Sequence, residues 1–178
     1  KFIKAHIELI RKKIEGLSNF KLIFSAHGLP EKNIKKGDPY QWQVEQSVNK
    51  IMEEINNDSI DHILSYQSRV GPLKWIGPST KDVIVENSKK EKHLVIVPIA
   101  FVSEHSETLM ELDIEYEKLA RKNGCKNYIR IEALGINEYF IESLSDLILH
   151  KDHYKFKDNL CPPKNRCPSN FTKCPCLN

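Results

Sequence analysis

The chain has 178 residues, of which 40% are hydrophobic, so it is long and apolar enough to bury the core of one domain. Its formal net charge is only +3, which gives no sign of nucleic-acid binding and no strongly basic patch for a membrane surface. No run of about 18 consecutive apolar residues occurs, which argues against a transmembrane helix in this sequence.

Apolar runs and segments with helical periodicity alternate along the chain. The first predicted element is an amphipathic helix over residues 2–16, with isoleucines on one side and basic residues on the other. A turn is predicted at 35–40 from its composition, and Gly124 is a predicted helix stop. The predicted strands are 21–26, 61–66, 93–99 and 127–132, and the remaining predicted helices are 41–56, 79–87, 108–122 and 138–149.

This alternation predicts an α/β fold of the doubly wound type, with a four-stranded parallel sheet flanked by helices. Right-handed crossovers then put the carboxyl ends of the strands on one edge of the sheet. His27, Ser68 and His105 each follow a predicted strand, so we expect them to share that edge. In open α/β sheets, ligands bind in the crevice just outside it.

The segment KLIFSAHGLP (21–30) is an apolar strand that ends at His27 and is closed by Gly28 and Pro30. A neutral imidazole can bind a metal or accept a proton near neutral pH. His27 is therefore a candidate functional residue, and the alternative is a histidine with a purely structural hydrogen bond.

The segment YQSRVGPLKWIGPST (66–80) follows the second predicted strand and carries two Gly-Pro pairs around Trp75. It is too apolar for an ordinary exposed loop. Trp75 could form the wall of a pocket for a flat aromatic ligand, or it could pack under a rigid turn.

The segment VPIAFVSEHSETLMELDIEY (97–116) runs from a strand into a helix that begins with several potential metal ligands. In an α-helix, residues four apart lie on one face, so Glu107, Glu111 and Glu115 are expected to form a row of carboxylates, with His105 beside it. A divalent cation would offset the repulsion between these charges. The alternative is a solvated helix face, with acidic residues favoured near the N-terminus by the helix dipole.

These three segments, in this order and spacing, resemble the C-terminal half of ferrochelatase, whose members insert ferrous iron into protoporphyrin IX. The resemblance covers roughly residues 20–150 and implies a Rossmann-like, chelatase-type domain over 1–150. Residues 1–18 would be the linking helix from a preceding N-terminal half, and 151–178 a Cys-rich extension. The family often has Ser in place of Gly28 and Asp in place of Glu104, and neither position is a proposed ligand.

The resemblance also implies roles for individual residues. His27 matches the active-site histidine, debated as metal ligand or proton acceptor, and Glu107 matches the catalytic acidic partner across the porphyrin. Glu111 and Glu115 match an acidic row proposed to deliver metal or remove protons. The implied substrate-binding residues are Trp75 in the pocket wall, Ser68 at a porphyrin propionate, and His105, a second family histidine beside the acidic row.

Four of the five cysteines lie in the last 18 residues, with the spacing C-x5-C-x6-C-x-C. Such density favours a crosslink or a metal, and disulfides are disfavoured in an intracellular protein. Many ferrochelatases carry a [2Fe-2S] cluster bound mainly by C-terminal cysteines, and this tail resembles that feature in position but not in spacing. The predicted cluster ligands are Cys161, Cys167, Cys174 and Cys176, with zinc or free thiols as the alternatives.

The predicted function is therefore that of a metal chelatase, a lyase of haem biosynthesis, with ferrous iron and protoporphyrin IX as substrates. The resemblance implies a cytoplasmic protein, with peripheral contact to the inner membrane and a homodimer as further candidates, and no nucleic-acid partner. Two alternatives stay open: a chelatase that loads cobalt or nickel into another tetrapyrrole, and a non-catalytic metal-binding or haem-binding module.

Overall fold

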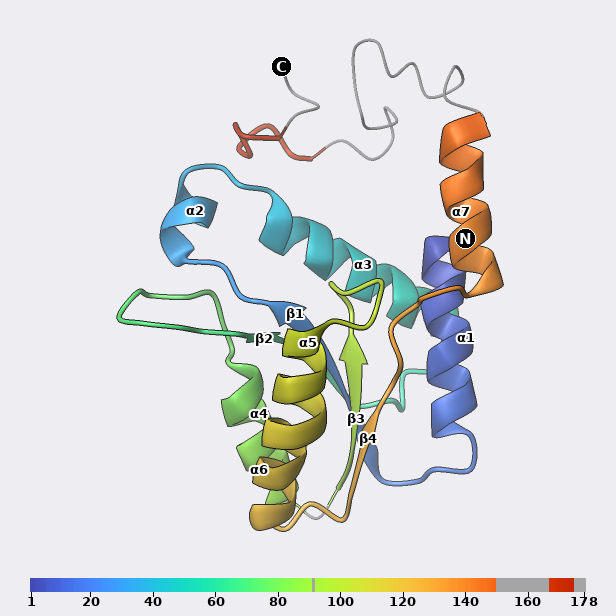
Figure 1. Ribbon diagram of the computed structural model, residues 1–178, viewed down its shortest axis with the longest axis vertical. Coiled ribbons are helices and arrows are strands. Elements are labelled where there is room, and N and C mark those ends of the chain that lie inside the picture. The colour runs from blue at the N-terminus through green and yellow to red at the C-terminus, as the bar shows by residue number, and fades with distance from the viewer. Residues whose placement is uncertain (91, 150–166, 175–178) are drawn as a thin grey trace.

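The computed structural model describes residues 1–90, 92–149 and 167–174. Four parallel strands form one sheet in the order β2-β1-β3-β4, which confirms the predicted four-stranded parallel sheet (Figure 1). The strands are β1 (Phe20–His27), β2 (His62–Gln67), β3 (His93–Pro98) and β4 (Asn127–Arg130). The last strand is two residues shorter than predicted, and the predicted carboxyl-end edge is where β1, β2 and β3 all stop.

The helices before β3 are α1 (Phe2–Ile14), α2 (Glu31–Lys35), α3 (Tyr40–Ile55) and α4 (Thr80–Ser88). After β3, one continuous helical run is made of α5 (Ser106–Thr108), η1 (Leu109–Tyr116) and α6 (Glu117–Lys122), and α7 (Glu138–Leu149) follows β4. The short helix α2 was not predicted, because five residues are too few to show a helical period. The predicted helix 108–122 exists, but η1 within it is a π-helix rather than an α-helix.

Helices cover both faces of the sheet, which makes the fold doubly wound. Successive side chains of a strand point to opposite faces. Leu22 and Phe24 of β1 accordingly pack with α1 and α3, whereas Ile23, between them, packs with α4 and the η1–α6 run. All three are fully buried, and burying each such side chain is worth about 1.5 to 3 kcal/mol.

Helix α7 packs against the N-terminal part of α1 (Figure 1). The two helices meet through Ala5 and Phe140, and the short apolar cluster they form is separate from the two cores of the sheet. Among the described residues, no helix is both long and apolar enough to span a lipid bilayer.

The described part of the tail, 167–174, lies against the corner between α2 and α3. The backbone N–H of Lys173 donates to the carbonyl of Gly37 at 3.1 Å. Cys167 and Cys174 are both buried there beside Trp42. The tail therefore contacts the domain on the side where β1 leads into α2.

Candidate active site

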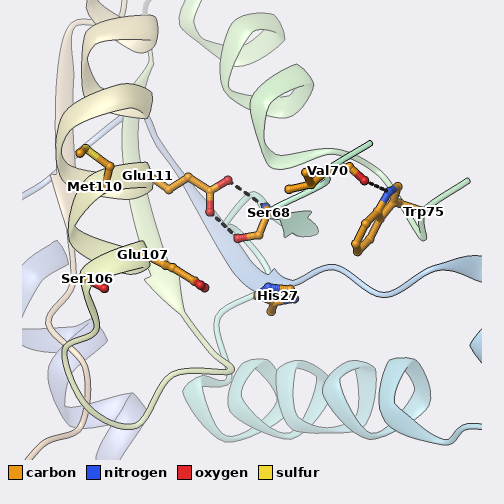
Figure 2. Close-up of a pocket in the computed structure, with 8 residues that line it drawn as sticks. All are labelled: His27, Ser68, Val70, Trp75, Ser106, Glu107, Met110 and Glu111. Atoms are coloured by element: carbon orange, nitrogen blue, oxygen red, sulfur yellow. Dashed lines mark hydrogen bonds between the residues drawn. The ribbon is translucent and has the colours of Figure 1, made fainter. Parts of the chain in front are cut away.

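A cavity of about 600 Å³ opens at the carboxyl-end edge of the sheet (Figure 2). Side chains reach it from the ends of β1 and β2 and from the start of the helical run after β3. The residues that line it are His27, Ser68, Val70, Trp75, Ser106, Glu107, Met110 and Glu111. The structure thus brings His27, Glu107 and two more of the predicted site residues, Ser68 and Glu111, around one space, with Trp75 in its wall.

His27 is the last residue of β1, and its ring faces the cavity. Its Nδ1 lies 2.7 Å from the carbonyl oxygen of Gly28, which can only accept, so Nδ1 must carry the proton. In the neutral imidazole this leaves the lone pair on Nε2. The backbone at His27 is held in turn by Tyr40, whose hydroxyl donates to the His27 carbonyl at 2.9 Å.

Burial raises the pKa of Tyr40 to about 12, with a smaller contribution from the nearby Asp38 carboxylate. The phenol therefore stays protonated and keeps donating to His27 across the physiological pH range.

Glu107 extends from α5 into the open part of the cavity, toward His27 (Figure 2). It is exposed, and no hydrogen bond or ion pair of its carboxylate is found among the described residues. Glu107 is thus a carboxylate free to meet a ligand, and it faces the imidazole across the cavity.

Glu111 is held very differently from Glu107. Its carboxylate accepts from the Gln67 amide at 2.9 Å, the Ser68 backbone N–H at 2.8 Å, the Ser68 hydroxyl, and the Tyr116 hydroxyl at 2.9 Å. A carboxylate offers about four acceptor positions, so these donors fill it. The predicted propionate contact at Ser68 is not tested by this geometry, since the Ser68 hydroxyl is engaged by Glu111.

Ser68 adopts a left-handed backbone with φ of 58°, which costs a non-glycine residue about 1 to 2 kcal/mol. In this conformation both the backbone N–H and the hydroxyl of Ser68 point toward Glu111. The strain is therefore found where β2 leaves the sheet and meets the helical run.

The π-helical register of η1 explains the contact between Glu111 and Tyr116. A π-helix closes its turns with bonds between residues five apart, and these two residues are five apart. Burial, then the nearby Glu111 carboxylate, raise the pKa of Tyr116, so its hydroxyl stays a donor. The sequence prediction of an α-helical row was wrong here, because the row's spacing of four no longer matches the turn.

Glu115 lies in the same π-helix but is exposed and is not among the residues that line the cavity. Within the described residues, no group of three or more His, Cys, Asp or Glu side chains is close enough to hold a metal ion. The predicted ligand set of His27, Glu107, Glu111 and Glu115 stays a prediction.

Trp75 stands on the opposite side of the cavity from the helical run (Figure 2). Its indole N–H donates to the Val70 carbonyl at 3.2 Å, and its backbone forms an antiparallel bridge with Pro30. At Gly28, a Cβ would lie 2.8 Å from the Gln67 carbonyl and 3.3 Å from the Trp75 ring. The glycine therefore lets the β1 end, the β2 end and the pocket wall pack closely.

His105 stands just outside the cavity and caps the helical run. Its Nδ1 accepts the Glu107 backbone N–H at 3.3 Å, so the proton of the neutral ring is on Nε2. Phe101 connects the two histidines, with ring centroids 6.3 Å from His105 and 6.5 Å from His27. His105 thus contacts the start of α5 and Phe101 rather than the cavity, and its predicted substrate contact stays a prediction.

Four residues with evident roles in this arrangement are absent from the sequence prediction. They are Gln67, Tyr116, Tyr40 and Phe101. Gln67, Phe101 and Tyr116 stand within motifs that the prediction used, so their position next to predicted site residues was the available signal. Nothing in an α-helical pattern could pair Tyr116 with Glu111.

Of the four predicted cluster cysteines, Cys161 and Cys176 lie outside the described residues. Cys167 and Cys174 are free thiols, buried together, and the Gln43 amide donates to the Cys167 sulfur at 3.5 Å. Burial, with the neighbouring Cys174 thiol, raises the pKa of Cys167. Two of the four predicted ligands are therefore side by side, and the cluster itself stays a prediction.

Comparison with known proteins gives a consistent result. The profile of the ferrochelatase family matches residues 1–152. The chain is 73% identical over 177 residues to a ferrochelatase of Pelagibacter ubique, covering 99% of this chain and 52% of that protein. It is 49% identical over 178 residues to a ferrochelatase of Rickettsia conorii, covering 98% of this chain and 51% of that protein. The chain thus spans about half the length of the curated relatives it matches, and it belongs to the ferrochelatase family.

Proposed function

We propose that the full-length protein containing this chain is a metal chelatase of the lyase class that inserts ferrous iron into protoporphyrin IX and forms protohaem. The observation that carries the proposal is the pair formed by His27 and Glu107 across one cavity, in a chain of the ferrochelatase family. The reaction consumes Fe²⁺ and the free-base porphyrin and releases the two protons of the pyrrole nitrogens.

His27 and Glu107 suit the two demands of this reaction. The Nε2 lone pair of His27 can take a pyrrole proton or bind the cation, since Nδ1 is committed to the Gly28 carbonyl. The exposed Glu107 carboxylate can bind Fe²⁺ as water leaves it, or take the second proton. An imidazole and a carboxylate on opposite sides let metal approach one face of the macrocycle while protons leave from the other.

The walls of the cavity suit a flat, apolar substrate. Trp75, Val70 and Met110 supply an apolar surface opposite and beside the polar pair. Because the chain spans half of its relatives, we assign the rest of the porphyrin pocket to the preceding half of the full-length protein. A planar ring held between rigid walls can be bent toward the geometry in which a pyrrole lone pair points at the metal.

Glu111 and Glu115 keep their predicted role as iron ligands on a path to the site, with one condition. Glu111 must exchange at least one of its four donors for the cation. Ser68 is the donor residue that also lines the cavity, so its hydroxyl is the donor we expect to be replaced. Cytoplasmic location, peripheral membrane contact and a homodimer likewise stay predictions.

The test of function uses the anaerobic full-length protein with Fe²⁺ and protoporphyrin, followed by absorbance. Wild type should convert the free-base spectrum to that of haem, and His27→Ala and Glu107→Gln should each lower kcat at least about 100-fold, since proton transfer by a positioned group contributes that much. Matched controls are His62→Ala on the exposed start of β2 and Glu117→Gln on α6, which should keep wild-type rates.

The outcomes separate the alternatives. Conversion with Co²⁺ or Ni²⁺ but not with Fe²⁺ would indicate a chelatase for another metal. Porphyrin binding without conversion by wild type would indicate a binding module. Full activity in both site variants would keep the chelatase and exclude His27 and Glu107 as its catalytic residues.

We further propose that Cys167 and Cys174 are two of four thiolate ligands of a [2Fe-2S] cluster, with Cys161 and Cys176 as the others. The support is the burial of the two described thiols side by side, with an amide donor on one sulfur. Anaerobically purified full-length protein should show cluster absorbance and about two acid-labile sulfides, both lost in Cys174→Ser. Retention of both in that variant, or bound zinc in place of iron, would contradict the assignment.

A further inference from the structure

Arg130, the last residue of β4, joins two carboxylates with one guanidinium group. Its Nε donates to one oxygen of Asp113, and its terminal nitrogen Nη2 donates to the other oxygen at 2.8 Å. Its other terminal nitrogen donates to both oxygens of Glu104, at 2.9 and 3.0 Å. The Arg130 side chain is only 15% exposed, whereas the side chains of Asp113 and Glu104 are 33% and 40% exposed, so the guanidinium is shielded from water and each carboxylate keeps one side in contact with it.

The two carboxylates stand at either end of the segment that carries the polar side of the cavity. Glu104 lies in the loop after β3, directly before His105, and Asp113 lies in the middle of the π-helix η1. Between them are Glu107 and Glu111, both of which line the cavity. A single side chain from a neighbouring strand therefore fixes both ends of this segment.

A further hydrogen bond holds the loop after β3 at Glu104. One oxygen of Glu104 also accepts the backbone N–H of Ala133 at 2.9 Å, in the segment that follows β4. The loop after β3 is thus bound to both the side chain and the backbone of the next strand's end.

Arginine suits this position and lysine does not. The guanidinium presents several N–H donors in a fixed plane and can bind two carboxylates at once, whereas a lysine ammonium is a single point charge on a flexible stem. Replacing Arg130 by Lys keeps the charge but leaves one of the two carboxylates without its partner.

We propose that Arg130 is a positioning residue that sets the distance of Glu107 and Glu111 from His27 by holding Glu104 and Asp113 together. The proposal deepens the iron-insertion function and rests on it for its kinetic readout. Misplacing a catalytic group by about 1 Å can cost about 100-fold in rate, so a contact this far from the reacting atoms can still control turnover.

The test compares Arg130→Lys with Arg121→Lys in the full-length protein. Arg121 forms an exposed ion pair with Glu117 on α6, at 2.5 Å, and is not among the residues that line the cavity. We expect Arg130→Lys to lower kcat about 10- to 100-fold, because it moves the carboxylates. The KM for protoporphyrin should stay within about twofold of wild type, because the Trp75 loop that forms the pocket wall is not held by Arg130. Arg121→Lys should match wild type.

Amide hydrogen exchange over residues 104–116 gives a second readout that needs no turnover. Faster exchange in Arg130→Lys, confined to this segment, supports the positioning role, and exchange equal to that of Arg121→Lys overturns it even if wild type proves inactive. A rise in the porphyrin KM with kcat unchanged also overturns it. If Arg130→Lys does not fold, Asp113→Asn and Glu104→Gln, which each remove one partner, must show the same kcat loss and exchange pattern.

Discussion

Glu107 and Glu111 are the same residue type four positions apart, yet they have opposite environments. Glu107 is exposed and without a partner in the described structure, whereas four donors fill the carboxylate of Glu111. A group that must follow a moving cation or proton needs freedom, and a group that must shape a cavity needs fixed partners. Under the proposed function, Glu107 is therefore the carboxylate that we expect to follow the cation or proton, and Glu111 the one that shapes the cavity.

His6 shows how a buried residue far from the cavity sets the pH dependence of stability. It is 4% exposed on α1, its ring meets the edge of Phe2 at 4.8 Å between centroids, and its Nε2 has no partner within the described residues. Burial lowers the pKa of His6 from 6.5 to about 4. Folding therefore favours the neutral ring, and below pH 6.5 the unfolded chain takes up a proton that the folded chain does not.

Protonation of His6 in the unfolded chain therefore lowers the free energy of unfolding as the pH falls from about 6.5 toward 4. At pH 5 the loss amounts to about 2 kcal/mol. His6→Leu removes this proton-binding group. We therefore expect the free energy of unfolding of the variant, relative to that of wild type, to be about 2 kcal/mol higher at pH 5 than at pH 7.5, measured in the full-length protein by urea unfolding at each pH. The control His62→Gln, at an exposed position, should gain nothing. A His6→Leu effect that is equal at both pH values would contradict this account.

At the scale of elements, the sheet was predictable because burial on one or both faces imprints a regular pattern on the sequence. Each apolar run became a strand, and the strand ends delivered His27 and Ser68 to one cavity. Right-handed connections between parallel strands account for the two helical layers, whereas the strand order β2-β1-β3-β4 was not predicted.

The π-helix η1 was not predictable from the same patterns. Its apolar residues fit an α-helical period, and the extra residue per turn is favoured by contacts that no local pattern contains. These contacts reach Glu111 from Gln67 and Ser68, and Asp113 from Arg130. The roles of Tyr116 and Arg130 depend on this register, which is why the sequence did not reveal them.

At the scale of the whole molecule, the tail and the active-site strand meet at one corner. The carbonyl of Gly37 accepts from Lys173 of the tail, and three residues later the Tyr40 hydroxyl donates to the backbone of His27. Gly37 has φ of 91°, and a Cβ there would lie 2.4 Å from the Thr172 hydroxyl oxygen. The tail can therefore sit in this place only because residue 37 has no side chain.

This contact predicts that Gly37→Ala exposes the tail cysteines of the full-length protein. Cys167 and Cys174 are 4% and 0% exposed, and burial suppresses thiol reactivity. In the reduced, metal-free wild type they should therefore react slowly with a maleimide. In Gly37→Ala they should react at least about tenfold faster. Gly71→Ala is the matched control: Gly71 has φ of 71° but no atom within 4 Å of its Cβ position, so it carries the same backbone strain without the clash. Residue-resolved mass spectrometry gives the rates, and equal rates in the two variants would contradict the proposed role of the contact between residue 37 and Thr172.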